Sequence, residues 1–171
     1  MLDFSSSRQL LISYVRELKD IKTKQIRLYT QWTDYDYSDQ FNHFLSEQKE
    51  KVSQQHIALK TLIDTWKGRT SQQTHNIVPS LLYQAEQIER YSQSKSEFIS
   101  VEPIIAQVLQ GVIHHELAIV RGAITLARTL REPIIVGTLV NVLEGQEKAY
   151  LQLRDFETEV SVENDYNTKV T

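Results

Sequence analysis

Four side chains that can bind a metal ion fall at related places in the two halves of the sequence. Glu17 and Glu116 lie in the similar triplets Arg-Glu-Leu and His-Glu-Leu, and His56 and Glu147 follow them further along the chain. Carboxylate oxygens together with imidazole nitrogens suit iron or manganese better than a soft metal. These four residues are therefore the candidate metal ligands.

A weak internal repeat relates the two halves. The segment 53–59, Ser-Gln-Gln-His-Ile-Ala-Leu, aligns with 147–153, Glu-Lys-Ala-Tyr-Leu-Gln-Leu. Residues three apart on a helix share a face, so a glutamate and a histidine at that spacing offer one metal ion an oxygen and a nitrogen. A lone glutamate followed by Glu-x-x-His on the next helix is one half of a dinuclear carboxylate site. Ser53 and Tyr150 stand at two positions of these pairs, where this pattern has a glutamate and a histidine.

Glu116 has two further interpretations besides metal binding. Its neighbours along the chain, among them Val112 and Ile119, are apolar. A buried carboxylate without a partner is costly, so a buried Glu116 that binds no metal requires an internal cation, such as Arg121, His56 or another base. Rotation of the helix would instead leave Glu116 partly exposed.

The other three candidates also have alternatives. Glu17 lies at the edge of an apolar stripe and can pair with a surface base such as Lys24. His56 can be a hydrogen-bonded core residue rather than a ligand. Glu147 can belong to a solvated charged ridge with Lys148.

Further polar residues lie close to the predicted ligands. Glu50, Glu144 and the pair His114-His115 could replace a ligand if a helix were rotated. Adjacent residues point about 100° apart on a helix, so the two histidines cannot easily face one ion, and one of them is expected to face a partner subunit. Tyr150 can cap a collapsed site with its hydroxyl group.

Apolar residues recur every three or four positions in four segments, which predicts four amphipathic helices. Serines, an aspartate and a proline mark the predicted helix starts: Ser5, Ser6 and Ser7, then Ser38 or Asp39, then Pro103. The predicted inward faces are Leu10, Tyr14, Leu18, Ile21, Gln25, Leu28 and Trp32 in the first segment, Phe41, Leu45, Val52, His56, Leu59, Ile63 and Trp66 in the second, and Ile135, Leu139, Val142, Gln146, Ala149, Leu153 and Phe156 in the fourth. The third, residues 104–130, is apolar nearly all round, which predicts a buried central helix.

The connections between these segments predict their arrangement. Short links join the first helix to the second and the third to the fourth, so each pair should be antiparallel. Residues 69–101 form a long crossover that carries a short extra helix. The predicted fold is an all-α four-helix bundle in a single domain, 1–158, and residues 159–171 are predicted to form a flexible polar tail.

Composition argues against several classes of protein. The chain has 171 residues, five glycines, three prolines and no cysteine, which removes disulfides, zinc fingers and thiolate nucleophiles. A net charge of −3 argues against a nucleic-acid partner. The start of the chain lacks the pattern of a secretory signal, which predicts a cytoplasmic protein. Polar residues interrupt the apolar segment 104–130, which argues against a membrane span.

The helix order, the long crossover and the spacing of the half-sites resemble the ferritin-like superfamily over residues 8–157. The layout is most similar to that of rubrerythrin-type bundles. This resemblance implies an iron or manganese site with Glu17, His56, Glu116 and Glu147 as ligands, and redox chemistry on oxygen or peroxide at an open coordination position. Because two ligand positions are substituted, the resemblance implies a partly decayed dinuclear site.

A second hypothesis is a non-catalytic bundle that acts as a binding or assembly module without metal. The serine and the tyrosine at ligand positions motivate it, together with an apolar third helix that can supply the face of a homodimer. A cavity left by absent metals could hold a small apolar ligand, although no residue identifies that ligand. Neither hypothesis assigns a catalytic residue, and the sequence does not decide whether the chain is an enzyme.

Overall fold

The computed structural model describes residues 4–33, 37–66 and 101–167, together with four single positions in the crossover. Side chains are described from residue 5 to residue 156 within these ranges. The described residues form helices and no strand: α1 (Phe4–Trp32), α2 (Asp39–Asp64), α4 (Glu102–Thr129) and α5 (Pro133–Asn167).

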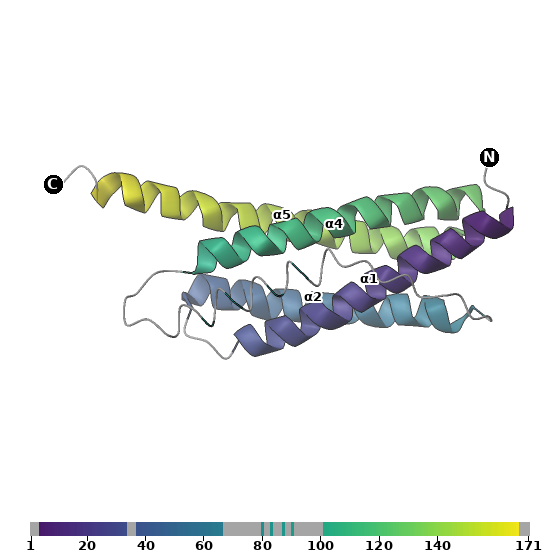
Figure 1. Cartoon of the computed structure of the whole chain (residues 1–171), viewed down its shortest axis with the longest axis horizontal. Helices are drawn as coiled ribbons and strands as arrows, with labels where there is room; N and C mark the ends of the chain where they lie inside the picture. Colours follow the sequence, from purple (N-terminus) through teal and green to yellow (C-terminus); the bar gives the residue numbers. More distant parts are fainter. Residues whose placement is uncertain are drawn as a thin grey trace.

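The helices form a bundle of two antiparallel pairs (Figure 1). α1 packs against α2 and α4, and α5 packs against α4 and α2. The end of α2 and the start of α4 lie at opposite ends of the bundle, so the connecting chain must span its length. The all-α four-helix bundle with a long crossover is therefore confirmed. In the crossover, Ser80, Tyr83, Gln87 and Arg90 are helical, and the rest of the predicted extra helix lies outside the described residues.

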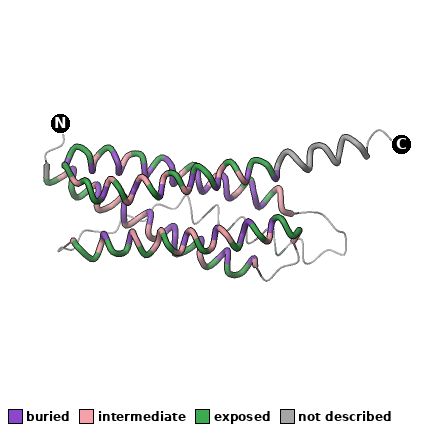
Figure 2. Tube along the Cα trace, turned by 180° about the vertical axis from the view of Figure 1, so that it is seen from behind, coloured by how far each residue is buried: buried purple, intermediate pink, exposed green. Residues whose placement is uncertain are grey.

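Each helix supplies a line of inward residues separated by alternating steps of four and three positions, and these lines form the core (Figure 2). A repeat of about 3.5 residues keeps one seam of a helix against its neighbours along their whole length. The line of α5 is the one predicted from the sequence. The line of α1 is shifted: it contains Leu11, Val15, Leu18, Lys22, Gln25, Tyr29 and Trp32, whereas Leu10 and Tyr14 are only half-buried.

The starts of the helices agree with prediction in two cases and differ in one. Ser38 caps α2, since its hydroxyl accepts a hydrogen bond from the Phe41 backbone nitrogen at 3.3 Å. Pro103 lies in the first turn of α4, as predicted. Ser5, Ser6 and Ser7 do not cap α1, because that helix already begins at Phe4 and a cap residue needs non-helical backbone.

A tight turn joins α4 to α5. The Arg131 backbone nitrogen donates to the Arg128 carbonyl at 3.1 Å, and the Glu132 nitrogen donates to the Ala127 carbonyl at 3.0 Å. This pair of bonds is the Schellman arrangement, which places Arg131 in the left-handed region at φ 56°. Pro133 then begins α5 with a fixed φ.

The ends of the chain bear on the predicted domain limits. α5 continues to Asn167, so part of the segment predicted as a flexible tail is helical. The division into a domain at 1–158 and a tail at 159–171 stays a prediction, because nothing else in the described residues tests it.

α4 is the one described helix long and apolar enough, by length and composition, to cross a membrane. Inside the bundle, 56% of its apolar stretch is buried. Burial of this kind is expected of the core helix of a bundle, and it agrees with the sequence-based expectation of a central α4.

Candidate functional site

The centre of the bundle holds a fully buried ion pair between α1 and α4. The Lys22 Nζ atom lies 2.8 Å from Glu116 Oε1, and both side chains have no exposed surface. Transferring either charge out of water alone would cost several kcal/mol, so each charge depends on the other. Of the interpretations open for Glu116, the structure shows the internal cation, and that cation is Lys22.

Three carboxamides complete the surroundings of this pair. Gln25 on α1 donates from Nε2 to Glu116 Oε2 at 3.2 Å. Gln146 on α5 satisfies its neighbours when its nitrogen donates to Glu116 Oε2 at 3.1 Å and its oxygen accepts from the Lys22 ammonium. The carboxamide of Gln55 on α2 lies 3.1 Å from that of Gln146. All four helices thus contribute to one polar layer.

This polar layer, formed by Lys22, Gln25, Gln55, Glu116 and Gln146, lies on the inward lines of the helices. Lys22 comes four residues after Leu18 and three before Gln25, so it occupies a regular core position of α1. The apolar stripe of the sequence does not identify Lys22, because the adjacent Ile21 fits the same stripe. The strict alternation of four-residue and three-residue steps from Leu11 to Trp32 is the sequence signal that identifies Lys22 as a core residue.

The register of α2 also differs from the prediction. Gln55 and His56 are both half-buried, but Gln55 continues the line of the buried Val52 and Leu59, and its carboxamide contacts Gln146. The predicted placement of His56 in the apolar face was therefore one residue out of register. This shift is why an amide, and not an imidazole, approaches the charged pair.

The buried charges change the ionisation of their surroundings. Burial raises the pKa of the Tyr29 phenol well above its ordinary value, and the negative charge of Glu116 raises it further. Burial lowers the pKa of the Lys22 ammonium, while the attraction and hydrogen bond of Glu116 oppose that change. A lowered lysine pKa and a raised tyrosine pKa both favour the uncharged form of the group.

The Tyr29 shift predicts a loss of stability at alkaline pH. Above about pH 10 the unfolded chain can release the phenol proton and the folded chain cannot, so the free energy of unfolding falls as pH rises through this window. Between pH 9 and pH 11 the wild type should lose about 1 kcal/mol relative to Tyr29→Phe. Urea titrations of both proteins at several pH values measure this difference.

The control for the alkaline experiment is Tyr150→Phe. Tyr150 is a half-buried tyrosine at the edge of the bundle, and its replacement also removes one phenol. Parallel pH profiles for the wild type and Tyr29→Phe would contradict the assignment of the alkaline loss to Tyr29.

Glu17 and His115 form a second contact between α1 and α4. The His115 Nε2 atom lies 3.3 Å from Glu17 Oε1, and both side chains are mostly buried. Glu17 is therefore a mostly buried residue and not a solvated one. His114, the other member of the histidine pair, points to the exposed side and packs edge-on against Tyr150, with ring centroids 4.6 Å apart.

Glu147 lies on the surface. It accepts a hydrogen bond from Arg121 Nη2 at 2.9 Å, and the side chains of Glu147 and Arg121 are 47% and 61% exposed. This position matches the interpretation of Glu147 as part of a solvated charged ridge, although its partner is on α4 and not on its own helix.

The four predicted metal ligands do not gather in one place. Glu116 contacts Lys22, Glu17 contacts His115, and Glu147 contacts Arg121. Within the described residues, no three histidine, aspartate or glutamate side chains form a group that could hold a metal ion. The side chains as placed do not fit a dinuclear iron or manganese centre, and metal binding by Glu17, His56, Glu116 and Glu147 stays a prediction.

Comparison with known proteins bears on the fold. No protein-family model matches the sequence, and no curated protein matches it. Solved structures match the bundle over most of its length. YcfI of Rhodopseudomonas palustris, described provisionally as a structural protein, has a TM-score of 0.74 at 16% identity and covers 90% of this chain and 94% of its own. The E. coli stress protein YciF has a TM-score of 0.75 at 14% identity. That match covers 89% of this chain and 94% of the YciF chain.

Proposed function

We propose that this chain is a non-catalytic helical bundle, a structural or assembly protein, in which a lysine replaces the metal cation of a ferritin-like carboxylate site. The observation that carries the proposal is the ion pair of Lys22 and Glu116, whose charged atoms lie 2.8 Å apart in the core. The ammonium group supplies the positive charge that a buried carboxylate requires.

The hydrogen bonds around Glu116 support this proposal. Its two oxygens face the Lys22 ammonium and the Gln25 amide, and the Gln146 amide bridges the same two charged groups. A metal ion bound to Glu116 would have to displace the Lys22 ammonium, whose side chain has no exposed surface. Pairing within the chain therefore competes directly with coordination of a metal.

The relation to the ferritin-like superfamily is part of the proposal. Helix order, crossover and the core position of Glu116 support it, and the similar structures YcfI and YciF share the bundle. Ser53 and Tyr150, which stand where a glutamate and a histidine would ligate, agree with a bundle that has lost its metal chemistry. The names of both similar proteins suggest a structural or stress-related role, which we extend to this chain.

Assembly into a homodimer would require a surface other than the apolar face of α4. The apolar side chains of α4, among them Ile105, Leu109, Ile113 and Val120, are buried in the core of one chain. α4 therefore exposes little apolar surface that could form the expected dimer interface.

Metal analysis tests the proposed function. The full-length chain, expressed with added iron or manganese and desalted, should retain well under one equivalent of either metal. Its melting temperature should not change when a chelator is added, because no bound metal contributes to stability. Retention of one or more equivalents, lost in a Glu116→Gln variant, would overturn the proposal and favour a metal protein.

A further inference from the structure

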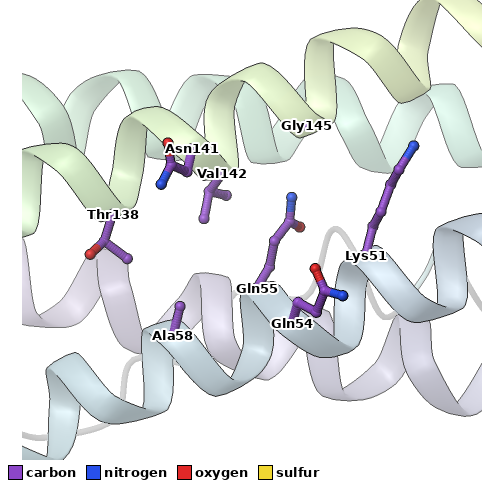
Figure 3. A pocket seen from close by; sticks show the side chains of 8 residues that line it. All are labelled: Lys51, Gln54, Gln55, Ala58, Thr138, Asn141, Val142 and Gly145. Carbon is purple, nitrogen blue, oxygen red and sulfur yellow. The ribbon is translucent and has the colours of Figure 1, made fainter.

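We propose that the groove between α2 and α5 binds a small neutral ligand rich in hydroxyl groups, such as a sugar or a polyol. The groove has a volume of about 410 Å³, within the range of small-molecule sites. α2 contributes Lys51, Gln54, Gln55 and Ala58, and α5 contributes Thr138, Asn141, Val142 and Gly145 (Figure 3).

The lining of the groove indicates the chemistry of its ligand. Gln54, Gln55 and Asn141 provide carboxamides, each of which offers both donors and acceptors, and Thr138 provides a hydroxyl group. A hydroxyl group also donates and accepts, so neighbouring hydroxyls of one ligand can pair with a carboxamide on both its oxygen and its nitrogen. The apolar atoms of Ala58 and Val142 can contact the C–H surface of such a ligand.

Charge argues for a neutral ligand. None of the eight described residues that line the groove is acidic. The nearby carboxylates of Glu50 and Glu47 already contact Gln54 and Lys51. Lys51 is the cation among them, and its Nζ atom lies 2.5 Å from Glu47 Oε1 on the same helix. Because Glu47 already balances this charge, an anionic ligand would have to compete with it.

Gln55 connects the groove to the polar layer in the core. Its carboxamide stands between the two helices beneath Gly145 (Figure 3), and its other contact is Gln146, which touches the Lys22–Glu116 pair. A Cβ atom at Gly145 would lie 2.5 Å from Gln55 Nε2, so the glycine leaves the space that this amide occupies. A ligand that hydrogen-bonds Gln55 therefore contacts the outer end of the polar layer.

An NMR titration of the full-length protein with maltose tests the proposal. We expect saturable shifts of the side-chain amide signals of Gln54, Gln55 and Asn141, with a dissociation constant of about 1 mM because a shallow open groove forms few contacts. The double variant Gln54→Ala with Asn141→Ala should bind about tenfold more weakly or not at all. Both of these residues are exposed, so the variant should keep the fold.

The matched control is Gln31→Ala with Gln107→Ala, which removes two exposed amides from α1 and α4 outside the groove and should leave binding unchanged. Shifts that rise linearly without saturation, or that are equal in the groove variant, would show only the general effect of a polyol on a protein surface and overturn the proposal. Tighter saturation with inorganic phosphate than with maltose would overturn the neutral class of ligand. None of these outcomes depends on whether the core binds metal.

Discussion

Lys22→Met should lower the free energy of unfolding by about 3–5 kcal/mol. Methionine keeps a straight, flexible chain of similar length but removes the ammonium group that lies 2.8 Å from Glu116 Oε1. The Glu116 carboxylate would then be buried with amide donors and without a counter-charge. For a protein of this size the loss corresponds to a fall in melting temperature of roughly 10 °C, measurable by calorimetry or urea titration.

The same substitution at a partly exposed pair on the bundle surface is the control for this prediction. Lys51 pairs with Glu47 one turn away on α2, where the two side chains are 30% and 32% exposed. Solvent screens such a pair, so Lys51→Met should cost less than about 1 kcal/mol. Equal losses for Lys22→Met and Lys51→Met would show that Glu116 does not depend on Lys22 for its charge balance.

The helices could be predicted because their signals are local. In α5, a start at Pro133 and a regular apolar line from Ile135 to Phe156 were sufficient to identify the buried face. The pairing of helices followed from short connections, and the confirmed bundle required no knowledge of individual contacts. Features that depend on a single helix, such as its start and its buried face, could therefore be predicted from the sequence.

The faces of α1 and α2 were harder to predict because adjacent residues compete for one position. Both Ile21 and Lys22 are buried. From the residue types alone, the isoleucine is expected in the core, because isoleucine is usually buried and lysine is usually exposed. In α2, Gln55 and His56 are neighbours, and a rotation of one residue exchanges an amide for an imidazole. Such rotations are set by packing against three other helices, which a stripe of apolar residues does not specify.

The partners of the candidate ligands could not be predicted for the same reason. Glu17 and His115 are 98 positions apart in sequence, and Glu147 and Arg121 are 26 apart. Each contact depends on the relative height and rotation of two helices. The sequence indicated that Glu116 needs a cation if it is buried, but the identity of that cation required the geometry of α1 against α4.

Removing both charges together should restore much of the stability that Lys22→Met alone removes. Glu116→Gln alone leaves the Lys22 ammonium buried without a counter-charge and should cost at least about 2 kcal/mol. In Lys22→Met with Glu116→Gln, the new carboxamide still offers an oxygen to Gln25, and no buried charge remains. We therefore expect the double variant to lie within about 2 kcal/mol of the wild type.

The double-mutant cycle isolates the interaction between the two charges. If the single losses are about 4 and 2 kcal/mol and the double loss is about 2 kcal/mol, the double loss is below their sum by about 4 kcal/mol. That difference is the coupling free energy of Lys22 and Glu116. Losses that simply add would mean that the two groups act independently in the core. Lys22→Met alone can be too unstable to purify. In that case, a folded double variant with Lys22→Met and Glu116→Gln still answers the question, because it shows that the bundle needs the lysine only when the Glu116 carboxylate is present.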